Sequence, residues 1–139
     1  EVEGTSDLYA EGVICSENGH DGICFWDESI GFVIDSTCEL NGSAGIMAND
    51  FADIEVQDSV CSENLGDGIS LYGEAYGELT GNLCDSNAEA GIYFADESGG
   101  IAEDNECSGN HWGIYVDAES YGLVGDNDLH GNSFDLYYE

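Results

Sequence analysis

The chain has 139 residues, enough for one domain of ordinary size. It carries 31 Asp and Glu residues but no Lys or Arg, so its formal net charge is −31. Nucleic acids and anionic membrane surfaces are excluded as partners, because no cationic side chain is present to neutralise phosphate groups. No apolar run approaches the roughly 18 residues that cross a bilayer, so we expect no membrane insertion.

A 23-residue repeat organises the chain from its beginning. Residues 1–10 match the last part of one repeat, and residues 125–139 form a partial repeat at the other end. The full repeats between them cover residues 11–33, 34–56, 57–79, 80–102 and 103–124, and the fifth is one residue short. A period of this length indicates a stack of similar coils, in which like residues form columns.

Three columns are visible in the sequence. Five of the six cysteines recur at one position, which Leu129 occupies in the sixth repeat: Cys15, Cys38, Cys61, Cys84 and Cys107. An asparagine follows each of these positions by three residues: Asn18, Asn41, Asn64, Asn87, Asn110 and Asn132. A glycine and an aliphatic residue come next, as in Gly91-Ile92. We expect the glycine to supply backbone freedom at a corner and the asparagines to form an amide ladder along the stack.

The apolar runs within each repeat are short and alternate with a period of two, which is typical of strands. In residues 91–94, for example, Ile92 and Phe94 would point inward and Tyr93 outward. Three short strands separated by turns fit into about 23 residues of a parallel β-helix. We therefore predict one all-β domain over residues 1–139, a β-solenoid of about six coils of 22–23 residues with three strands per coil.

Residues 81–87 (GNLCDSN) and 91–94 (GIYF) resemble the repeat of right-handed parallel β-helix proteins in the pectin-lyase-like superfamily. The resemblance is greatest to the short-coil repeats of periplasmic and surface proteins. It covers nearly the whole chain and implies a right-handed solenoid. It implies much less about function, because that superfamily includes lyases, hydrolases, epimerases and plain scaffolds.

The cysteine column has two interpretations. It could be a line of metal-binding or redox-active thiols, or a stack of small buried apolar residues. Leu129 in the sixth position favours packing, and in-register parallel side chains point the same way rather than at each other. We expect free, buried thiols with a structural role. Cys24 lies outside the column.

Carboxylates recur at an outward turn, where stacked negative charges repel one another unless a cation lies between them. The candidate metal-binding residues are Asp27, Glu28, Asp50, Glu74, Asp96, Glu97 and Glu119. Ca²⁺ accepts several carboxylate oxygens in flexible geometry, so calcium is the expected cation. The alternative is a solvated acidic face. No organic cofactor is indicated.

Catalysis is not expected. The lyases of the resembled superfamily rely on Arg or Lys, its polygalacturonase-type hydrolases on a basic motif, and its epimerases on a Pro-containing motif, and the chain has no Arg, Lys or Pro. Two suitably spaced carboxylates suffice for glycoside hydrolysis, which leaves that activity as an open alternative. No catalytic residue is therefore assigned.

The terminal repeats suggest a role. Val2 and Tyr138 share one column, and the chain has no capping helix, so a second copy could continue the coil head to tail. The expected assembly ends contain Val2, Leu8, Leu136, Tyr137 and Tyr138. Our main hypothesis is a non-catalytic extracellular or cell-surface protein (the periplasm being possible) that stacks into a filament. Absence of Lys and Arg suits this location, because trypsin-like proteases find no cleavage site. The alternative is a carbohydrate-binding or glycan-processing module for neutral glycans.

Overall fold

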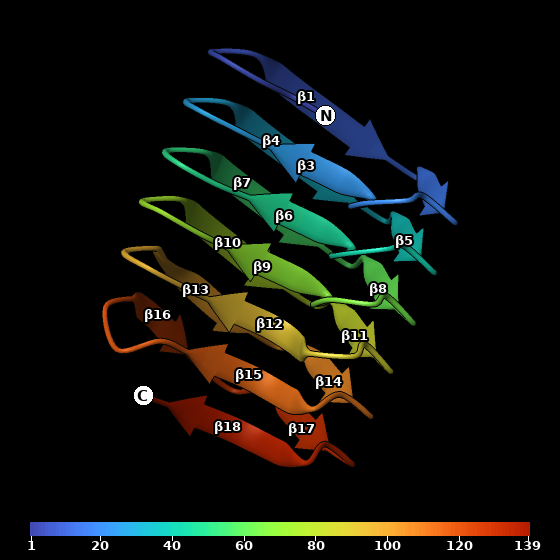
Figure 1. Cartoon of the computed structure of the whole chain (residues 1–139), viewed down its shortest axis with the longest axis vertical. Coiled ribbons are helices and arrows are strands. Elements are labelled where there is room, and N and C mark those ends of the chain that lie inside the picture. The colour runs from blue at the N-terminus through green and yellow to red at the C-terminus, as the bar shows by residue number, and fades with distance from the viewer.

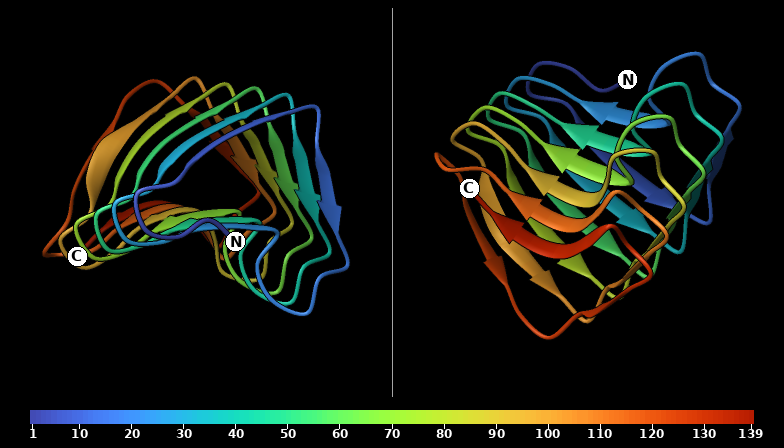
Figure 2. Two further views of the ribbon diagram at one scale, coloured as in Figure 1. Left: turned by 90° about the horizontal axis from the view of Figure 1, so that it is seen from above. Right: turned by 60° about the horizontal axis from the view of Figure 1, so that its bottom comes forward.

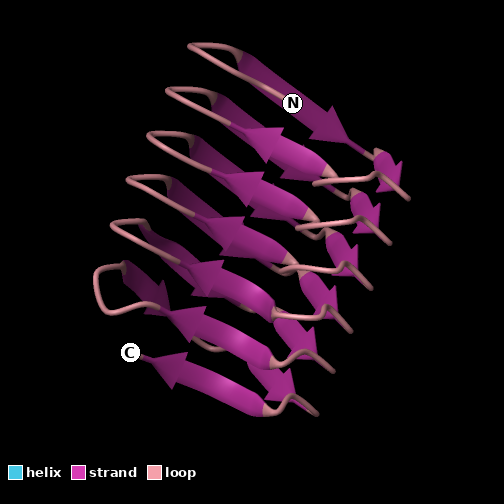
Figure 3. Ribbon diagram, viewed as in Figure 1, coloured by secondary structure: helices cyan, strands magenta, loops and turns pink.

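A computed structural model describes all residues 1–139 and contains strands and turns only (Figure 1, Figure 3). The strands form three six-stranded parallel sheets, and the chain passes through each sheet once per coil in a right-handed turn. No helix that could cross a membrane is present. The predicted all-β solenoid of about six coils with three strands per coil is confirmed.

We name the sheets after their first strands. The β1 sheet contains β1 (Asp7–Glu11), β4 (Ile30–Ile34), β7 (Asp53–Gln57), β10 (Tyr76–Thr80), β13 (Gly99–Glu103) and β16 (Tyr121–Val124). The β2 sheet contains β2 (Ile14–Ser16), β5 (Thr37–Glu39), β8 (Val60–Ser62), β11 (Leu83–Asp85), β14 (Glu106–Ser108) and β17 (Asp128–His130). The β3 sheet contains β3 (Ile23–Phe25), β6 (Ile46–Ala48), β9 (Ile69–Leu71), β12 (Ala90–Phe94), β15 (Trp112–Val116) and β18 (Phe134–Tyr138).

The sequence repeat sets the strand register. Cys38 pairs with Cys15 on one side and Cys61 on the other, and Leu129 takes the equivalent place beside Cys107. Seen down the stack, successive coils overlie one another with a progressive offset (Figure 2). Every sheet therefore has the same coil order from the N-terminal to the C-terminal end.

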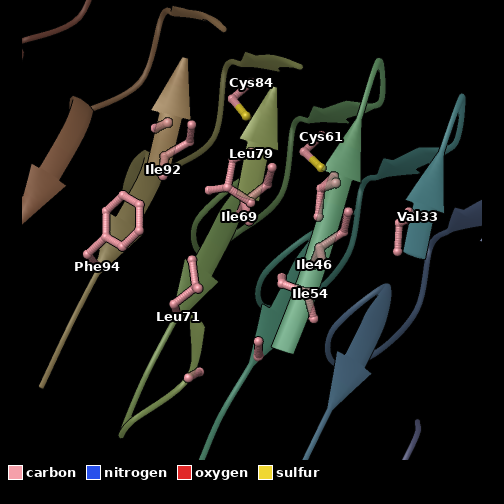
Figure 4. Packing of buried hydrophobic residues seen from close by; sticks show 14 of the residues in the cluster. Val33, Ile46, Ile54, Cys61, Ile69, Leu71, Leu79, Cys84, Ile92 and Phe94 are labelled. Atoms are coloured by element: carbon pink, nitrogen blue, oxygen red, sulfur yellow. The ribbon is translucent and has the colours of Figure 1, made fainter. Parts of the chain in front are cut away.

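The inward columns form one continuous core of 21 buried residues (Figure 4). Ile92 and Phe94 are fully buried, as predicted, and so are the other members of the inward columns in the middle coils: Ile46, Ile69, Ala48, Leu71, Val56, Leu79 and Ala102. A further column was not predicted, although glycine recurs in it at the repeat spacing from Gly77 onward: Leu8, Gly31, Ile54, Gly77, Gly100 and Gly122.

This column lies beside the inward column that contains Phe25 and Leu71, and a glycine in the first column lies next to a large residue in the second. A Cβ atom on Gly31 would lie 2.4 Å from the ring of Phe25, and one on Gly77 would lie 2.6 Å from Leu71. At Gly31 and Gly77 the space that the glycine leaves is therefore filled by the large side chain six residues earlier, and at Gly122 it is filled by Phe94 of the preceding coil. Interiors packed at near-crystalline density require such compensation.

The glycine that precedes each inward isoleucine has a different role from the one predicted. Gly45, Gly68 and Gly91 do not have positive φ angles. A Cβ atom on any of them would lie 2.6–2.7 Å from the carbonyl oxygen of the equivalent glycine in the next coil. Close approach of backbones, rather than conformational freedom, requires glycine here.

The left-handed conformations instead occur at three corners per coil, many of them at aspartates. Asp27, Asp50 and Asp96 occupy one corner with φ of 57–60°, and Asp35, Asp58 and Asp104 another with φ of 48–55°. Aspartate and asparagine tolerate this region better than other residues with a side chain. The recurring carboxylates thus lie on the turns that define the coil.

Candidate assembly ends and acidic turns

The predicted amide ladder is present and has a direction. Asn41 donates its backbone N–H to Oδ1 of Asn64 at 3.1 Å and its Nδ2 to the same oxygen at 2.9 Å. Nδ2 of Asn41 also donates to the carbonyl of Cys15, one coil earlier, at 3.1 Å. The pattern repeats from Asn18 to Asn132. Between successive asparagines, donation therefore runs toward the C-terminal end, while each Nδ2 from Asn41 onward also donates to a carbonyl of the preceding coil.

A second ladder lies at another corner, between the β1 and β2 sheets. Ser59 donates its backbone N–H to Oδ1 of Asn82 at 3.0 Å, and Asn82 donates to Asn105 at 2.9 Å. Ser36 precedes these residues and Asn127 follows them. Sequence analysis missed this ladder because its members change from serine to asparagine along the stack. The 23-residue spacing of Asn82 and Asn105 was the available signal.

The C-terminal coil exposes side chains from columns that are buried elsewhere. Leu136 is 45% exposed and Tyr138 is 54% exposed, whereas their neighbours Ile114 and Val116 are 0% and 3% exposed. All residues of β18 are exposed. These predicted assembly residues, with Tyr137, form an apolar surface at the end of the stack.

The N-terminal end is partly covered by its own first residues. Val2 forms an isolated parallel bridge with Phe25, accepts a hydrogen bond from the N–H of Trp26 at 2.9 Å and donates to the carbonyl of Cys24 at 2.8 Å. Val2 and Leu8 are half-buried and pack against the core. The predicted N-terminal assembly residues thus cover part of the first coil.

The two ends would compete for one place in a continuous stack. Residues 1–3 form a layer of the β3 sheet above β3, and β18 closes the sixth coil of the same sheet. If β1 and β2 of a second copy paired with β16 and β17, its β3 would face β18. Residues 1–3 of that copy would then occupy the space of residues 137–139. Direct stacking requires one of the two segments to move.

The ends of the first ladder are chemically complementary. At the C-terminal end, the backbone N–H of Asn132 has no hydrogen-bond acceptor. At the N-terminal end, Oδ1 of Asn18 accepts no hydrogen bond. A donor is therefore open at one end and an acceptor at the other.

The candidate metal-binding residues lie at one corner, after the β3 sheet, and all are exposed. Asp27 and Asp96 accept hydrogen bonds from the backbone N–H groups of Gly4 (3.0 Å) and Gly73 (3.4 Å) in the preceding coils. These carboxylates therefore cap turns. A cavity of about 260 Å³ brings four of the seven candidates together: Asp50, Glu74, Asp96 and Glu97. Asp27, Glu28 and Glu119 do not line it, and no three metal-ligating side chains converge.

The thiols of the cysteine column are free, and those of Cys38 to Cys107 are buried. Hydrogen bonding to Cys38, together with burial, raises the pKa of Cys61 well above its ordinary value. Hydrogen bonding to Cys84 and burial act in the same direction on the pKa of Cys107. Neutral thiols are weak metal ligands and weak nucleophiles, which supports a packing role. Burial raises the pKa of Cys24 to about 11.

An aromatic array runs along the outer face of the β3 sheet. The rings of Tyr93 and Tyr115 stack with centroids 4.8 Å apart, and Tyr72, Trp112 and Tyr137 pack against them at 5.1–5.7 Å. The Tyr115 hydroxyl donates to Oε2 of Glu139 at 2.7 Å. Sequence analysis predicted that Tyr93 faces outward. Tyr115 and Tyr137 share its column, whereas Tyr72 and Trp112 lie in two other columns and their approach to it was not predictable.

A buried carboxylate adjoins the array. Asp67 is only 7% exposed, and it accepts hydrogen bonds from the N–H of Ala90 at 2.9 Å and from the Tyr72 hydroxyl at 3.4 Å. Burial raises its pKa to about 6. Nothing in the local sequence distinguished Asp67 from the exposed acids, since burial here comes from neighbouring coils.

The comparisons with known proteins agree with this geometry. A family model described as a right handed beta helix region matches residues 1–101 and again residues 40–138. No curated protein matches the chain, and no solved structure does.

Proposed function

The chain belongs to the right-handed β-helix family, and from this premise we propose that it is a non-catalytic extracellular structural protein that stacks end to end. The observation that carries the proposal is the complementarity of the two ends. The open N–H of Asn132 meets the open oxygen of Asn18, and the exposed Leu136 and Tyr138 meet Ile23 and Phe25 of the next copy.

Three new strand pairs would hold such a junction. They are β16 with β1, β17 with β2 and β18 with β3, in the parallel register used throughout each sheet. This head-to-tail contact does not close on itself, so it generates a filament. Of the two segments that compete for one place, we take residues 1–3 as the one that moves, so their release from Phe25 is the controlling step.

Cations on the acidic corner would relieve the repulsion between subunits that each carry a net charge of −31. The cavity bounded by Asp50, Glu74, Asp96 and Glu97 is the proposed location for Ca²⁺. Its carboxylates come from three successive coils. A bound cation would therefore also link coils along the stack.

Sedimentation velocity in CaCl₂ and in EDTA, at matched ionic strength, tests this proposal. We expect larger species in calcium, and more of them after deletion of residues 1–3, because that deletion uncovers Phe25. Leu136→Asp with Tyr138→Asp should give a monomer. Leu65→Asp is the control, since Leu65 is 73% exposed in a middle coil, away from either end and from the acidic corner. A sharp monomer for the full chain and the deletion in both buffers would refute stacking.

The aromatic array on the β3 sheet favours a second candidate, binding of a neutral glycan. Flat tyrosine and tryptophan rings stack against sugar rings, and the hydroxyls and carboxylates beside them can bond sugar hydroxyls. Retention on insoluble neutral polysaccharides, compared between the chain and Tyr93→Ser, tests this candidate. Equal retention of both proteins would count against it.

A further inference from the structure

A notch on the outer face of the β1 sheet is separate from the stacking ends and from the aromatic array. In the outward column that contains Tyr76, Gly99 and Tyr121, the glycine interrupts a row of larger side chains. A Cβ atom on Gly99 would lie 3.1 Å from Cδ2 of Tyr121 and 3.9 Å from Cδ2 of Tyr76. The two rings thus approach Gly99 from the coils on either side.

The notch is a cavity of about 370 Å³, within the range of small-molecule sites. Its walls are the rings of Tyr76 and Tyr121 and the side chains of Ile101 and Leu123, and its rim carries the carboxylates of Glu74 and Glu97. Tyr121 is 62% exposed and Leu123 is 67% exposed, so the walls are accessible.

We propose that this notch binds a small alkylammonium compound. The carboxylates of Glu74 and Glu97 have no cationic side chain to pair with, because the chain contains no Lys or Arg. A cation near a tyrosine ring is stabilised by the ring quadrupole, and an aliphatic stem is stabilised by burial against Ile101 and Leu123. The site therefore matches a charged head attached to an apolar stem.

A hydrated divalent ion does not suit the notch. Ca²⁺ takes six to eight oxygen ligands, whereas this cavity offers two carboxylates among apolar walls. Neutral sugars would leave the negative charge of the rim uncompensated. Charge and apolar surface together select an organic cation. The notch lies away from both stacking ends, but it shares Glu74 and Glu97 with the cavity proposed for Ca²⁺, so binding is measured in calcium-free buffer.

NMR titration of the ¹⁵N-labelled chain with butylammonium, and with 1-butanol as the neutral isostere, tests the proposal. Salt at about 0.5 M screens the general attraction of cations to an acidic protein. We expect saturable shifts at the amides of Gly99, Gly100 and Tyr121 with butylammonium and none with butanol. Equal shifts with butanol, or shifts spread evenly over all acidic turns, would overturn the proposal.

Variants localise the site. Gly99→Val should fill the notch, and Tyr121→Ser should remove one wall without adding volume; each should weaken butylammonium binding by about tenfold, the order expected for loss of a cation–π contact. Glu97→Gln should weaken it less.

Glu28→Gln is the matched control, because Glu28 has the same place in the repeat but lies outside the cavity. Unchanged affinity in Tyr121→Ser, or equal weakening in Glu28→Gln, would refute the assignment. Tighter binding of a lysine-containing peptide than of butylammonium would overturn the choice of a small molecule.

Discussion

The middle coils and the C-terminal coil contain the same columns but bury them to very different extents. Ile92 has a coil on each side and is fully buried, whereas Leu136, two coils later in the same column, is 45% exposed. The strand conformation and register are nevertheless the same in both places. Local sequence therefore specifies the coil, while burial depends on the number of neighbouring coils, as expected for a repeat protein.

The largest expected difference between the two regions is in core truncation. Ile92→Ala should reduce the free energy of unfolding by about 3–5 kcal/mol, because it leaves a cavity in a packed interior. Leu136→Ala should reduce it by less than about 1 kcal/mol in a monomer. Urea denaturation of both variants measures the difference. Equal losses would mean that the end coil is covered in solution.

Ladder truncation should show the same contrast with a smaller effect. Asn64→Ala leaves the buried N–H of Asn41 without its acceptor and should cost about 3 kcal/mol. Asn132→Ala removes an acceptor for Asn110, but the open end admits water, so about 1 kcal/mol is expected. Denaturation at a protein concentration too low for assembly is the suitable measurement. A loss as large at Asn132 as at Asn64 would contradict this contrast.

The third contrast concerns two aspartates in one column. Asp21 and Asp67 each accept a hydrogen bond from an alanine N–H in the next coil, at 3.0 and 2.9 Å, but Asp67 is buried and Asp21 half-buried. The pKa of Asp67 is raised to about 6 in the folded state. Above about pH 4 the folded state therefore keeps a proton that the unfolded state loses, and ionisation of Asp67 destabilises the fold as pH rises from about 4 to above 6.

Asp67→Asn should therefore stabilise the chain at pH 7.5, by up to about 3 kcal/mol, since the shift from 3.8 to about 6 corresponds to that amount. The gain should become small near pH 4, because Asp67 is then protonated in the folded state and only partly ionised in the unfolded state. Asp21→Asn is the control and should change stability less. Unfolding free energies at pH 4 and pH 7.5 provide the comparison, and a gain at Asp67 that did not depend on pH would contradict it.

Features that repeat without change in residue type were predictable from the sequence. The coil boundaries, the cysteine column and the first asparagine ladder all belong to this group, because one residue type recurs at 22–23-residue spacing. Features built from unlike residues were not predictable. The second ladder changes from Ser59 to Asn82. The packing of Phe25 over Gly31 depends on two columns at once, because a large residue in one column lies over a small residue in the other.

The candidate sites also divide into features that recurring residue types predict and features that depend on several coils. Exposed carboxylates such as Asp50 and Glu97 could be assigned to one turn, but their association in a cavity depends on turn geometry across coils. The burial of Asp67 and the notch over Gly99 also depend on residues one coil away. Sequence position identifies the corner on which a residue lies, whereas its environment is set by the coils before and after it.

The left-handed aspartates at the corners have a consequence for engineering and for evolution. At φ near +50 to +60°, asparagine and glycine are as compatible with the backbone as aspartate, and glycine already occupies Gly73 and Gly81 in these columns. Net charge is therefore separable from the fold at these positions. A lineage, or a designer, could neutralise one corner at a time and obtain solenoids of the same shape with widely different solubility and salt tolerance.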